Sequence, residues 1–139
     1  MTQIKTDIRW KQRYKNYQRA YHLLKMSLEI TEPSEVERAG IIQFFEMSFE
    51  LAWKLMKDYL DSEGYSTKSP RETIKQAYQI QLIINGHHWL YALVDRNLTV
   101  HTYDENKAKE IENKIREQYF PLLKQLNSQI VDKINRLDN

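Results

Sequence analysis

The residues best suited to chemistry in this 139-residue chain stand in one stretch, RNLTVHTYDE, at positions 96–105. Arg96 is always cationic, and its planar fork of N–H groups matches phosphate oxygens. His101 can gain or lose a proton near neutral pH, and Tyr103 adds a hydroxyl group. An arginine with a histidine is a minimal set for phosphodiester chemistry without a metal ion. The stretch therefore offers Arg96 and His101 as the candidate catalytic residues.

The elements around the motif must bring these two side chains together. On one continuous helix each residue turns by about 100°, which would hold Arg96 and His101 roughly 140° apart. The β-branched pair Thr99 and Val100 is less favourable in a helix, and Thr102 with Glu105 fits a capping box that opens a new helix. We therefore expect the motif to straddle a helix junction. Either a turn returns His101 toward Arg96, or two copies of the motif face each other across a dimer.

Two further side chains of the stretch are expected to bind substrate. Asn97 can orient a phosphate or a base edge, and Tyr103 lies where the free N–H groups of a helix N-terminus favour an anion. The same residues also fit a structural role, in which Arg96 pairs with Asp95, Asp104 or Glu105 and His101 is a loop histidine. Spacing alone favours the structural role, so the chemical interpretation depends on what surrounds the motif.

The rest of the sequence predicts helices and no strands. Apolar residues at alternating spacings of four and three mark a first helix over about residues 7–28. A second helix is expected from the Ser34–Glu37 capping box to Gly64, and a third from Pro70, capped by Ser69 with Glu72, to Asn85–Gly86. A short helix is expected around Trp89–Val94. The last helix is expected after Thr102, with a kink or split near Phe120 caused by Pro121. The predicted fold is an all-α, up-and-down bundle of four main helices with a short additional one, in a single domain over residues 1–139.

Composition narrows the class of protein. Hydrophobic residues make up 41% of the chain, which allows a packed core, and the net charge of +2 neither demands nor excludes a nucleic-acid partner. There is no cysteine, which removes disulfides and thiolate zinc sites. No stretch is long and apolar enough to cross a membrane. The sequence predicts a soluble cytoplasmic protein.

Candidate metal sites are weak, and no cofactor is expected. Glu46 and Glu50 have the spacing of a bundle metal site, but no Glu-x-x-His motif accompanies them. We expect them to face solvent, a partner or the neighbouring motif. His87 and His88 are adjacent and point in different directions on a helix, so a shared metal is not expected.

The first helix also interleaves basic and aromatic residues. A face of this kind can hold RNA phosphates. The alternative, a solvated basic face over a core stripe of aromatics, is the favoured interpretation. The basic residues are Lys5, Arg9, Lys11, Arg13, Lys15 and Arg19, and the aromatic ones are Trp10, Tyr14 and Tyr17.

The motif and its surroundings resemble a known superfamily. RNLTVHTYDE is similar to the Arg-x4-His-x-Tyr motif of HEPN (higher eukaryotes and prokaryotes nucleotide-binding) proteins. The segments FEMSFELAWKLMKDYL, SPRETIKQAY and LYALVDRN resemble one branch, the bacterial nucleotidyltransferase substrate-binding proteins, which are partners of minimal nucleotidyltransferases. The resemblance covers most of the chain.

The resemblance implies a homodimeric four-helix bundle in which Arg96 and His101 of two protomers line a cleft that cuts RNA without metal. The resemblance also implies how toxin–antitoxin members are regulated. In those members a separately encoded nucleotidyltransferase adds AMP to the motif tyrosine, here Tyr103, and silences the toxin. The alternative is a non-catalytic substrate-binding subunit. This chain cannot be the transferase, since it has no Gly-Ser followed by an Asp-x-Asp pair and no glycine-rich phosphate loop.

Overall fold

The described part of the chain consists of helices joined by short loops, with no strand. The structure is a computed structural model that describes residues 2–98 and 104–138, and side chains within 8–97 and 104–137. The helices are α1 (Thr2–Ser27), α2 (Glu35–Ser62), α3 (Pro70–Gln79), α4 (Gly86–Leu98), α5 (Glu105–Lys114), the π-helical turn η2 (Ile115–Tyr119) and α6 (Phe120–Asp138). None of the described helices is long and apolar enough to cross a membrane.

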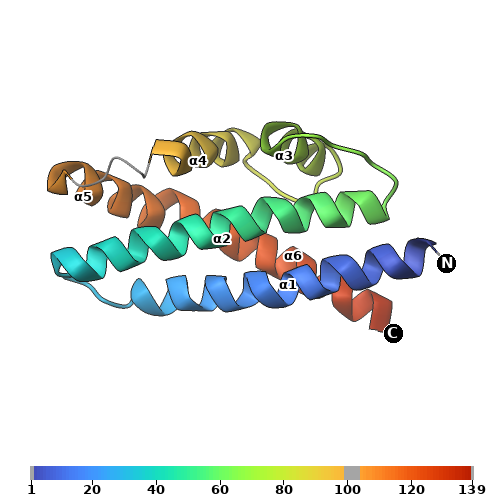
Figure 1. Cartoon of the computed structure of the whole chain (residues 1–139), viewed down its shortest axis with the longest axis horizontal. Coiled ribbons are helices and arrows are strands. Elements are labelled where there is room, and N and C mark those ends of the chain that lie inside the picture. The colour runs from blue at the N-terminus through green and yellow to red at the C-terminus, as the bar shows by residue number, and fades with distance from the viewer. Residues whose placement is uncertain (1, 99–103, 139) are drawn as a thin grey trace.

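Four columns of helix run up and down the molecule (Figure 1). α1 and α2 are antiparallel neighbours, α3 and α4 follow one another back along α2, and α5, η2 and α6 return along the bundle. The two chain ends therefore lie at the same end of the bundle, opposite the start of α5. The predicted all-α, up-and-down bundle is confirmed, with the short α3 and α4 sharing one column.

α2 lies at the centre because apolar side chains cover much of its circumference. It contacts α1, α3, α4, α5 and α6. Phe45 stacks on Tyr119 with ring centroids 5.5 Å apart, and Phe49 lies 5.8 Å from Trp89. These aromatic contacts join α2 to the columns that carry the two sides of the motif.

The aromatic stripe of α1 is core, as the favoured interpretation predicted. Trp10, Tyr14, Tyr17 and Tyr21 are buried, and the Tyr17 hydroxyl donates to the Leu123 carbonyl oxygen at 2.7 Å. The rings of this stripe are therefore occupied by packing rather than open to a ligand.

The ends of α2 follow local sequence signals. The Ser34 hydroxyl accepts from the Glu37 N–H while the Glu37 carboxylate accepts from the Ser34 N–H, which completes the predicted capping box. At the other end Gly64 has a φ of +89°, a conformation that glycine adopts without steric penalty. Tyr65 N–H bonds to Leu60 O and Gly64 N–H to Asp61 O, the Schellman pattern of a helix end.

α3 begins as predicted but ends six residues earlier than Asn85. Ser69 caps it and Pro70 opens it, although the Glu72 carboxylate accepts from the Lys68 N–H rather than closing a second capping box. Gln81 takes a φ of +63° and terminates the helix with a Schellman pattern of its own. The early turn brings Leu82 and Ile83 into the core and leaves Tyr78 half exposed. The free energy gained by burying Leu82 and Ile83 therefore exceeds what continuation of the helix would have gained.

The last column is divided where Pro121 predicts a break. Proline has no N–H and its ring clashes with the carbonyl four residues earlier. The turn before it is the π-helical η2, in which the Phe120 N–H bonds to the Ile115 oxygen, five residues back. The start of the column differs from the prediction: Asp104, not Thr102, is the N-cap, and its carboxylate accepts from the Asn106 N–H at 2.9 Å.

Candidate functional site

The motif straddles a helix junction, as the sequence predicted. Arg96 and Asn97 lie in the last turn of α4, and the next helix begins at Glu105. His101 and Tyr103 lie outside the described residues, as does Thr102. That Arg96 and His101 form one catalytic site therefore stays a prediction, and so do the substrate-binding roles of Asn97 and Tyr103.

Arg96 points back onto the central helix. Its terminal nitrogen lies 3.6 Å from a carboxylate oxygen of Glu50 on α2, and about a third of its side chain is exposed (29%). Glu50 also pairs with Lys54 at 3.5 Å. The expectation that Glu46 or Glu50 contacts the neighbouring motif is thus confirmed for Glu50. A carboxylate at this place orients the guanidinium and leaves part of it open to a ligand.

Two carboxylates that the sequence offered as partners of Arg96 are engaged with other groups. Asp95 accepts a hydrogen bond from the Tyr119 hydroxyl of η2 and lies 3.4 Å from the Lys114 ammonium group. Glu105 pairs with Arg38 of α2. The contacts of Asp95 hold the end of α4 in place, and the pairing of Glu105 with Arg38 holds the start of α5. Both helix ends border the motif.

Tyr119 ties the π-helical turn to the motif's arginine turn. Burial is the main reason that the pKa of Tyr119 is raised, and the hydrogen bond and charge of Asp95 add to it. The hydroxyl therefore stays protonated and can keep donating to Asp95. No sequence motif singled out this contact. The one local signal near this contact is Pro121, which predicts an irregular turn before it. That turn is π-helical, and π-helical turns recur at functional sites.

A buried ionic network holds the start of the last column. The Arg38 Nε donates to Glu112 at 2.7 Å, and the same guanidinium contacts Glu105 and the Pro33 carbonyl. Glu112 also accepts from Arg116 Nε at 2.7 Å. Arg38 and Glu112 are both buried, so their charges are tolerable only as partners.

Arg116 extends this network to the loop between α1 and α2. Its two terminal nitrogens donate to the carbonyl oxygens of Leu28 at 2.8 Å and Ile30 at 2.6 Å. Three columns of the bundle are thereby joined at the end where the motif lies. No local pattern indicates this network, since its members are separated by up to 88 residues.

Glu112 should make the fold sensitive to acid. Burial opposes its ionisation, but the hydrogen bonds and charges of Arg38 and Arg116 outweigh burial and lower its pKa from the ordinary 4.5. A lowered folded pKa means that the carboxylate stabilises the fold above pH 4.5 and that this stabilisation is lost as the pH falls through the folded value. Urea unfolding at a series of pH values should show a steeper acid loss in wild type than in Glu112→Gln. Equal slopes would contradict the prediction.

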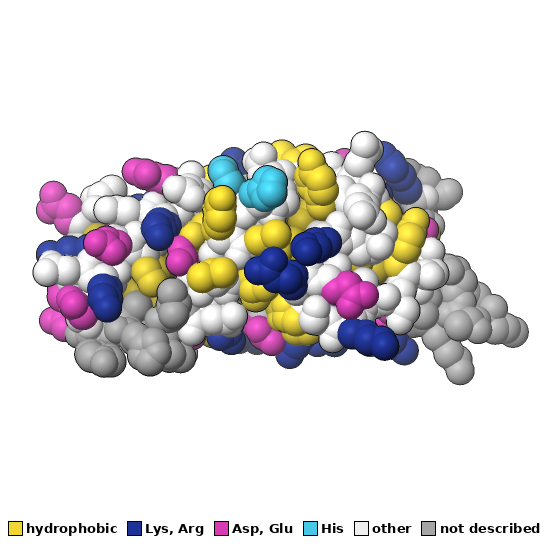
Figure 2. Space-filling model, turned by 90° about the horizontal axis from the view of Figure 1, so that it is seen from above, with side chains coloured by type: hydrophobic (Ala, Val, Ile, Leu, Met, Phe, Trp, Pro, Cys, Tyr) yellow, Lys and Arg dark blue, Asp and Glu magenta, His cyan; other side chains and the backbone are white. Residues whose placement is uncertain are grey.

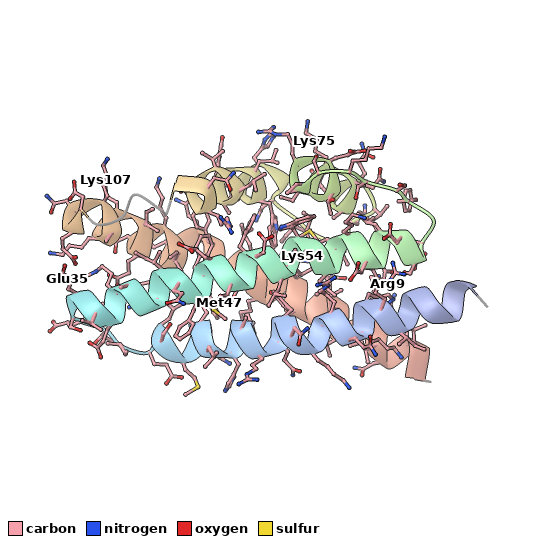
Figure 3. All side chains as sticks on the ribbon, in the orientation of Figure 1. Arg9, Glu35, Met47, Lys54, Lys75 and Lys107 are labelled. Carbon is pink, nitrogen blue, oxygen red and sulfur yellow. The ribbon has the colours of Figure 1, made fainter. Side chains whose placement is uncertain are left out.

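A groove between α2 and α5 lies near the motif but has the wrong charge for a phosphate. It has a volume of about 510 Å³, and its lining includes the carboxylates of Glu35, Glu46 and Glu105. Figure 3 shows Glu35 and Lys107 at this end of the bundle. A polyanion would be repelled by three carboxylates, so we do not place RNA in this groove.

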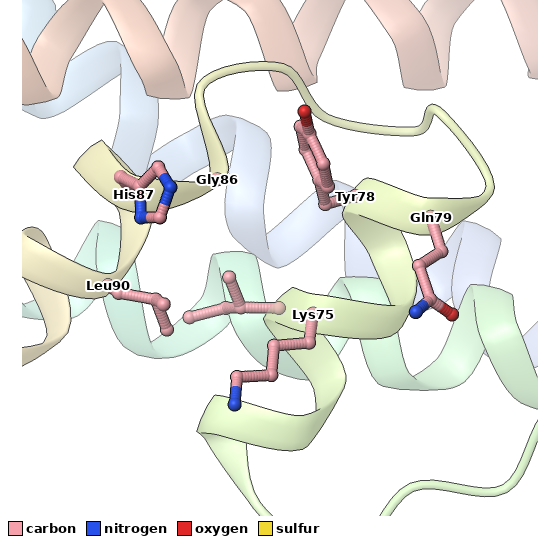
Figure 4. A pocket seen from close by; sticks show the side chains of 7 residues that line it. Lys75, Tyr78, Gln79, Gly86, His87 and Leu90 are labelled. Atoms are coloured by element: carbon pink, nitrogen blue, oxygen red, sulfur yellow. The ribbon is translucent and has the colours of Figure 1, made fainter.

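The two adjacent histidines, His87 and His88, are exposed residues of α4, and Figure 2 shows histidine side chains on this face of the molecule. His87 lines a hollow of about 310 Å³ with Ile74, Lys75 and Leu90 (Figure 4). His88 instead approaches the ring of Tyr91, at 6.3 Å between centroids. Their different directions agree with the prediction. Within residues 2–98 and 104–138, no three histidine or acidic side chains group as metal ligands.

Comparison with known proteins identifies the family of this chain. A model of the family described as "Nucleotidyltransferase substrate binding protein like" matches residues 12–132. The chain belongs to this family. The match covers both sides of the motif and every helix of the bundle, so the resemblance inferred from RNLTVHTYDE is confirmed.

One named relative supports the HEPN-type assignment, and one solved structure supports the fold. A Haemophilus influenzae protein named Probable ribonuclease HepT is 33% identical over 78 residues, 52% of this chain and 53% of that protein. The chain thus spans about half the length of the curated relative it matches. A crystal structure of a Thermus thermophilus protein is 34% identical, covers 81% of this chain and 97% of that one, and has a TM-score of 0.76. The helical bundle is therefore shared with a solved relative.

Proposed function

We propose that this protein is the HEPN-type partner of a separately encoded minimal nucleotidyltransferase. In this pair it is the metal-independent endoribonuclease toxin, and addition of AMP to Tyr103 silences it. The observation that carries the proposal is the Arg96-x4-His101-x-Tyr103 motif at a helix junction within a chain of the nucleotidyltransferase substrate-binding family. The name of the Haemophilus influenzae relative adds support for RNA as the substrate.

The proposed chemistry needs only side chains of the motif. His101 takes the proton from a ribose 2′-hydroxyl, and the 2′-oxygen attacks the adjacent phosphorus. The bond from phosphorus to the 5′-oxygen breaks, and that oxygen receives a proton from a histidine in its acid form. Arg96 stabilises the charge that grows on the phosphate oxygens. The products are a 2′,3′-cyclic phosphate and a 5′-hydroxyl, with no metal ion required.

A homodimer belongs to the same proposal. The α3–α4 side bears four exposed large hydrophobic residues, Tyr78, Ile84, Tyr91 and Val94, and Figure 2 shows apolar side chains grouped on this face. Exposed apolar groups that lie together mark interaction surfaces. Since Arg96 follows Val94 on the same helix, a dimer through this face brings two copies of the motif near one another.

The second candidate is a non-catalytic subunit that presents a substrate, or Tyr103, to the transferase. The family description itself favours this candidate, because it names substrate binding rather than cleavage. In that case Arg96 and His101 are ligand contacts. The pairing with a nucleotidyltransferase is common to both candidates.

The deciding experiment is cleavage of a mixed RNA pool by purified protein in EDTA, with wild type beside His101→Ala. Cleavage by wild type alone, ending in 2′,3′-cyclic phosphate, is the expected result. Equal cleavage by the folded variant would overturn the catalytic role of His101. Cleavage by neither protein would favour the non-catalytic subunit.

The pairing is tested separately by co-purification with the nucleotidyltransferase encoded nearby. Incubation with ATP should add one AMP to the chain, and Tyr103→Phe should prevent it. Absence of both a complex and a mass change would count against the pairing itself.

A further inference from the structure

The outer face of α1 has an unusual concentration of positive charge. From Ile8 to Leu28 the chain has six lysines and arginines and no aspartate or glutamate, although the whole protein carries only +2. α1 lies at the edge of the bundle, with α2 between it and the α3–α4 column (Figure 1). Its outer face is therefore on the opposite side from the proposed dimer surface.

The tertiary structure divides five of these six cations, all except Lys11, into two groups. Arg13 bonds to Asp58 at 2.9 Å and Arg9 lies 4.0 Å from Asp61, so both are directed toward α2. The second group, Lys15, Arg19 and Lys25, is exposed and makes no ion pair with any described residue.

Lys15 and Lys25 of the second group lie with Lys11 on one stripe of the helix. Positions 11, 15, 18, 22 and 25 alternate in spacings of four and three, which holds them on one face. Arg19 borders this stripe. At 1.5 Å of rise per residue the stripe is about 21 Å long, so it presents a row of cations rather than one point of charge.

A hollow at the border of α1 and α6 adds a neutral donor to this row. Its volume is about 330 Å³, and its lining includes Lys15, Arg19, His22, Lys25 and Asn127. The Tyr14 hydroxyl donates to the Asn127 side-chain oxygen at 2.9 Å. That bond occupies the amide oxygen and leaves the amide NH₂ group as a donor beside the cations.

The surroundings of the stripe indicate what kind of partner it suits. The tryptophan and the tyrosines of α1 are buried, so none of these rings can stack on a base. The only large hydrophobic side chains exposed among residues 8–27 are Ile8 and Met26, near the two limits of the stripe. A protein interface has an apolar centre, and a membrane-bound helix has an apolar face. This face has neither.

We infer that the outer face of α1, with Lys15, Arg19, Lys25 and Asn127, binds the phosphate backbone of single-stranded RNA without reading its bases. The choice of RNA among polyanions rests on the proposed function. The site is separate from Arg96, and it holds the RNA while the motif acts on one phosphodiester. Binding here should depend strongly on salt and weakly on sequence, because phosphate contacts release counterions and carry no base information.

The test measures binding of a fluorescein-labelled 2′-O-methyl RNA 20-mer of mixed sequence by anisotropy. This probe has no 2′-hydroxyl, so it stays intact whether or not the protein is a nuclease. The variant Lys15→Gln/Arg19→Gln/Lys25→Gln is compared with Lys68→Gln/Arg71→Gln/Lys75→Gln. The control removes two lysines and one arginine that are also exposed.

The α1 variant should bind at least tenfold more weakly than wild type at equal salt, and the control within about twofold. The slope of log affinity against log salt should fall by about 2 in the α1 variant, since each lost phosphate contact removes about 0.7 for a single strand. Equal losses in the two variants, or no binding by wild type, would overturn the inference. So would binding to vesicles of anionic lipid that the α1 substitutions abolish while RNA binding persists. A protein that binds this probe but fails to cut RNA in EDTA leaves the inference standing and removes the nuclease.

Discussion

Replacing Arg96 by alanine is expected to slow RNA cleavage by roughly 100- to 1,000-fold, the usual loss when one donor to a transition-state oxyanion is removed. The fold should change little. The ion pair of Arg96 with Glu50 is 3.6 Å long and partly exposed, and such pairs contribute about 0–1 kcal/mol. Rates on a labelled RNA and a thermal melt of the same preparation measure the two effects together.

Two conservative variants separate charge from geometry at this position. Arg96→Lys keeps the charge but loses the planar fork, so its cleavage rate should lie between those of wild type and Arg96→Ala. Glu50→Gln removes the carboxylate that orients the guanidinium and should lower the rate far less than Arg96→Ala does. If a folded Arg96→Ala variant cuts RNA at the wild-type rate, Arg96 has no catalytic role.

Arg38→Ala is expected to lower the free energy of unfolding by about 3–5 kcal/mol, the typical result of leaving one partner of a buried ion pair uncompensated. Arg38 bonds to Glu112 at 2.7 Å and also contacts Glu105 and the Pro33 carbonyl. Its loss leaves Glu112 buried with Arg116 as the one remaining partner in the network. It also releases the first turn of α5. Urea unfolding followed by circular dichroism measures the change.

An exposed arginine provides the matched control. Arg71 on α3 has no described ion pair, and Arg71→Ala should change the free energy of unfolding by no more than about 0.5 kcal/mol. A similar small change in Arg38→Ala would show that the network contributes little to stability.

Several parts of the fold could be predicted from sequence because they depend on neighbouring residues. The capping box of Ser34 and Glu37 forms within one helical turn. Gly64 ends α2 because it can adopt a positive φ, and Pro121 divides the last column because it lacks an N–H. The stripe from Trp10 to Leu24 was predicted as core because helical periodicity places it on one face.

The failures came where tertiary contacts outweighed local preference. α3 ends at Gln79 because a turn there allows Leu82 and Ile83 to be buried. This turn requires a positive φ at Gln81, which is unfavourable for a residue other than glycine. Asp104 caps α5 where Thr102 was expected, although both residue types suit that role. Local signals cannot rank such neighbouring alternatives.

The sequence by itself determined the helical class, both ends of α2, the start of α3 and the position of the motif at a junction, because these depend on side-chain type and spacing along the chain. Only the tertiary structure decided which charges meet. Arg96 and Glu50 are 46 positions apart, and Arg38 and Glu112 are 74 apart. Their pairing depends on how four columns of helix are aligned, which is set by packing of the aromatic core. The same packing turns Arg9 and Arg13 toward α2 and leaves Lys15, Arg19 and Lys25 facing solvent.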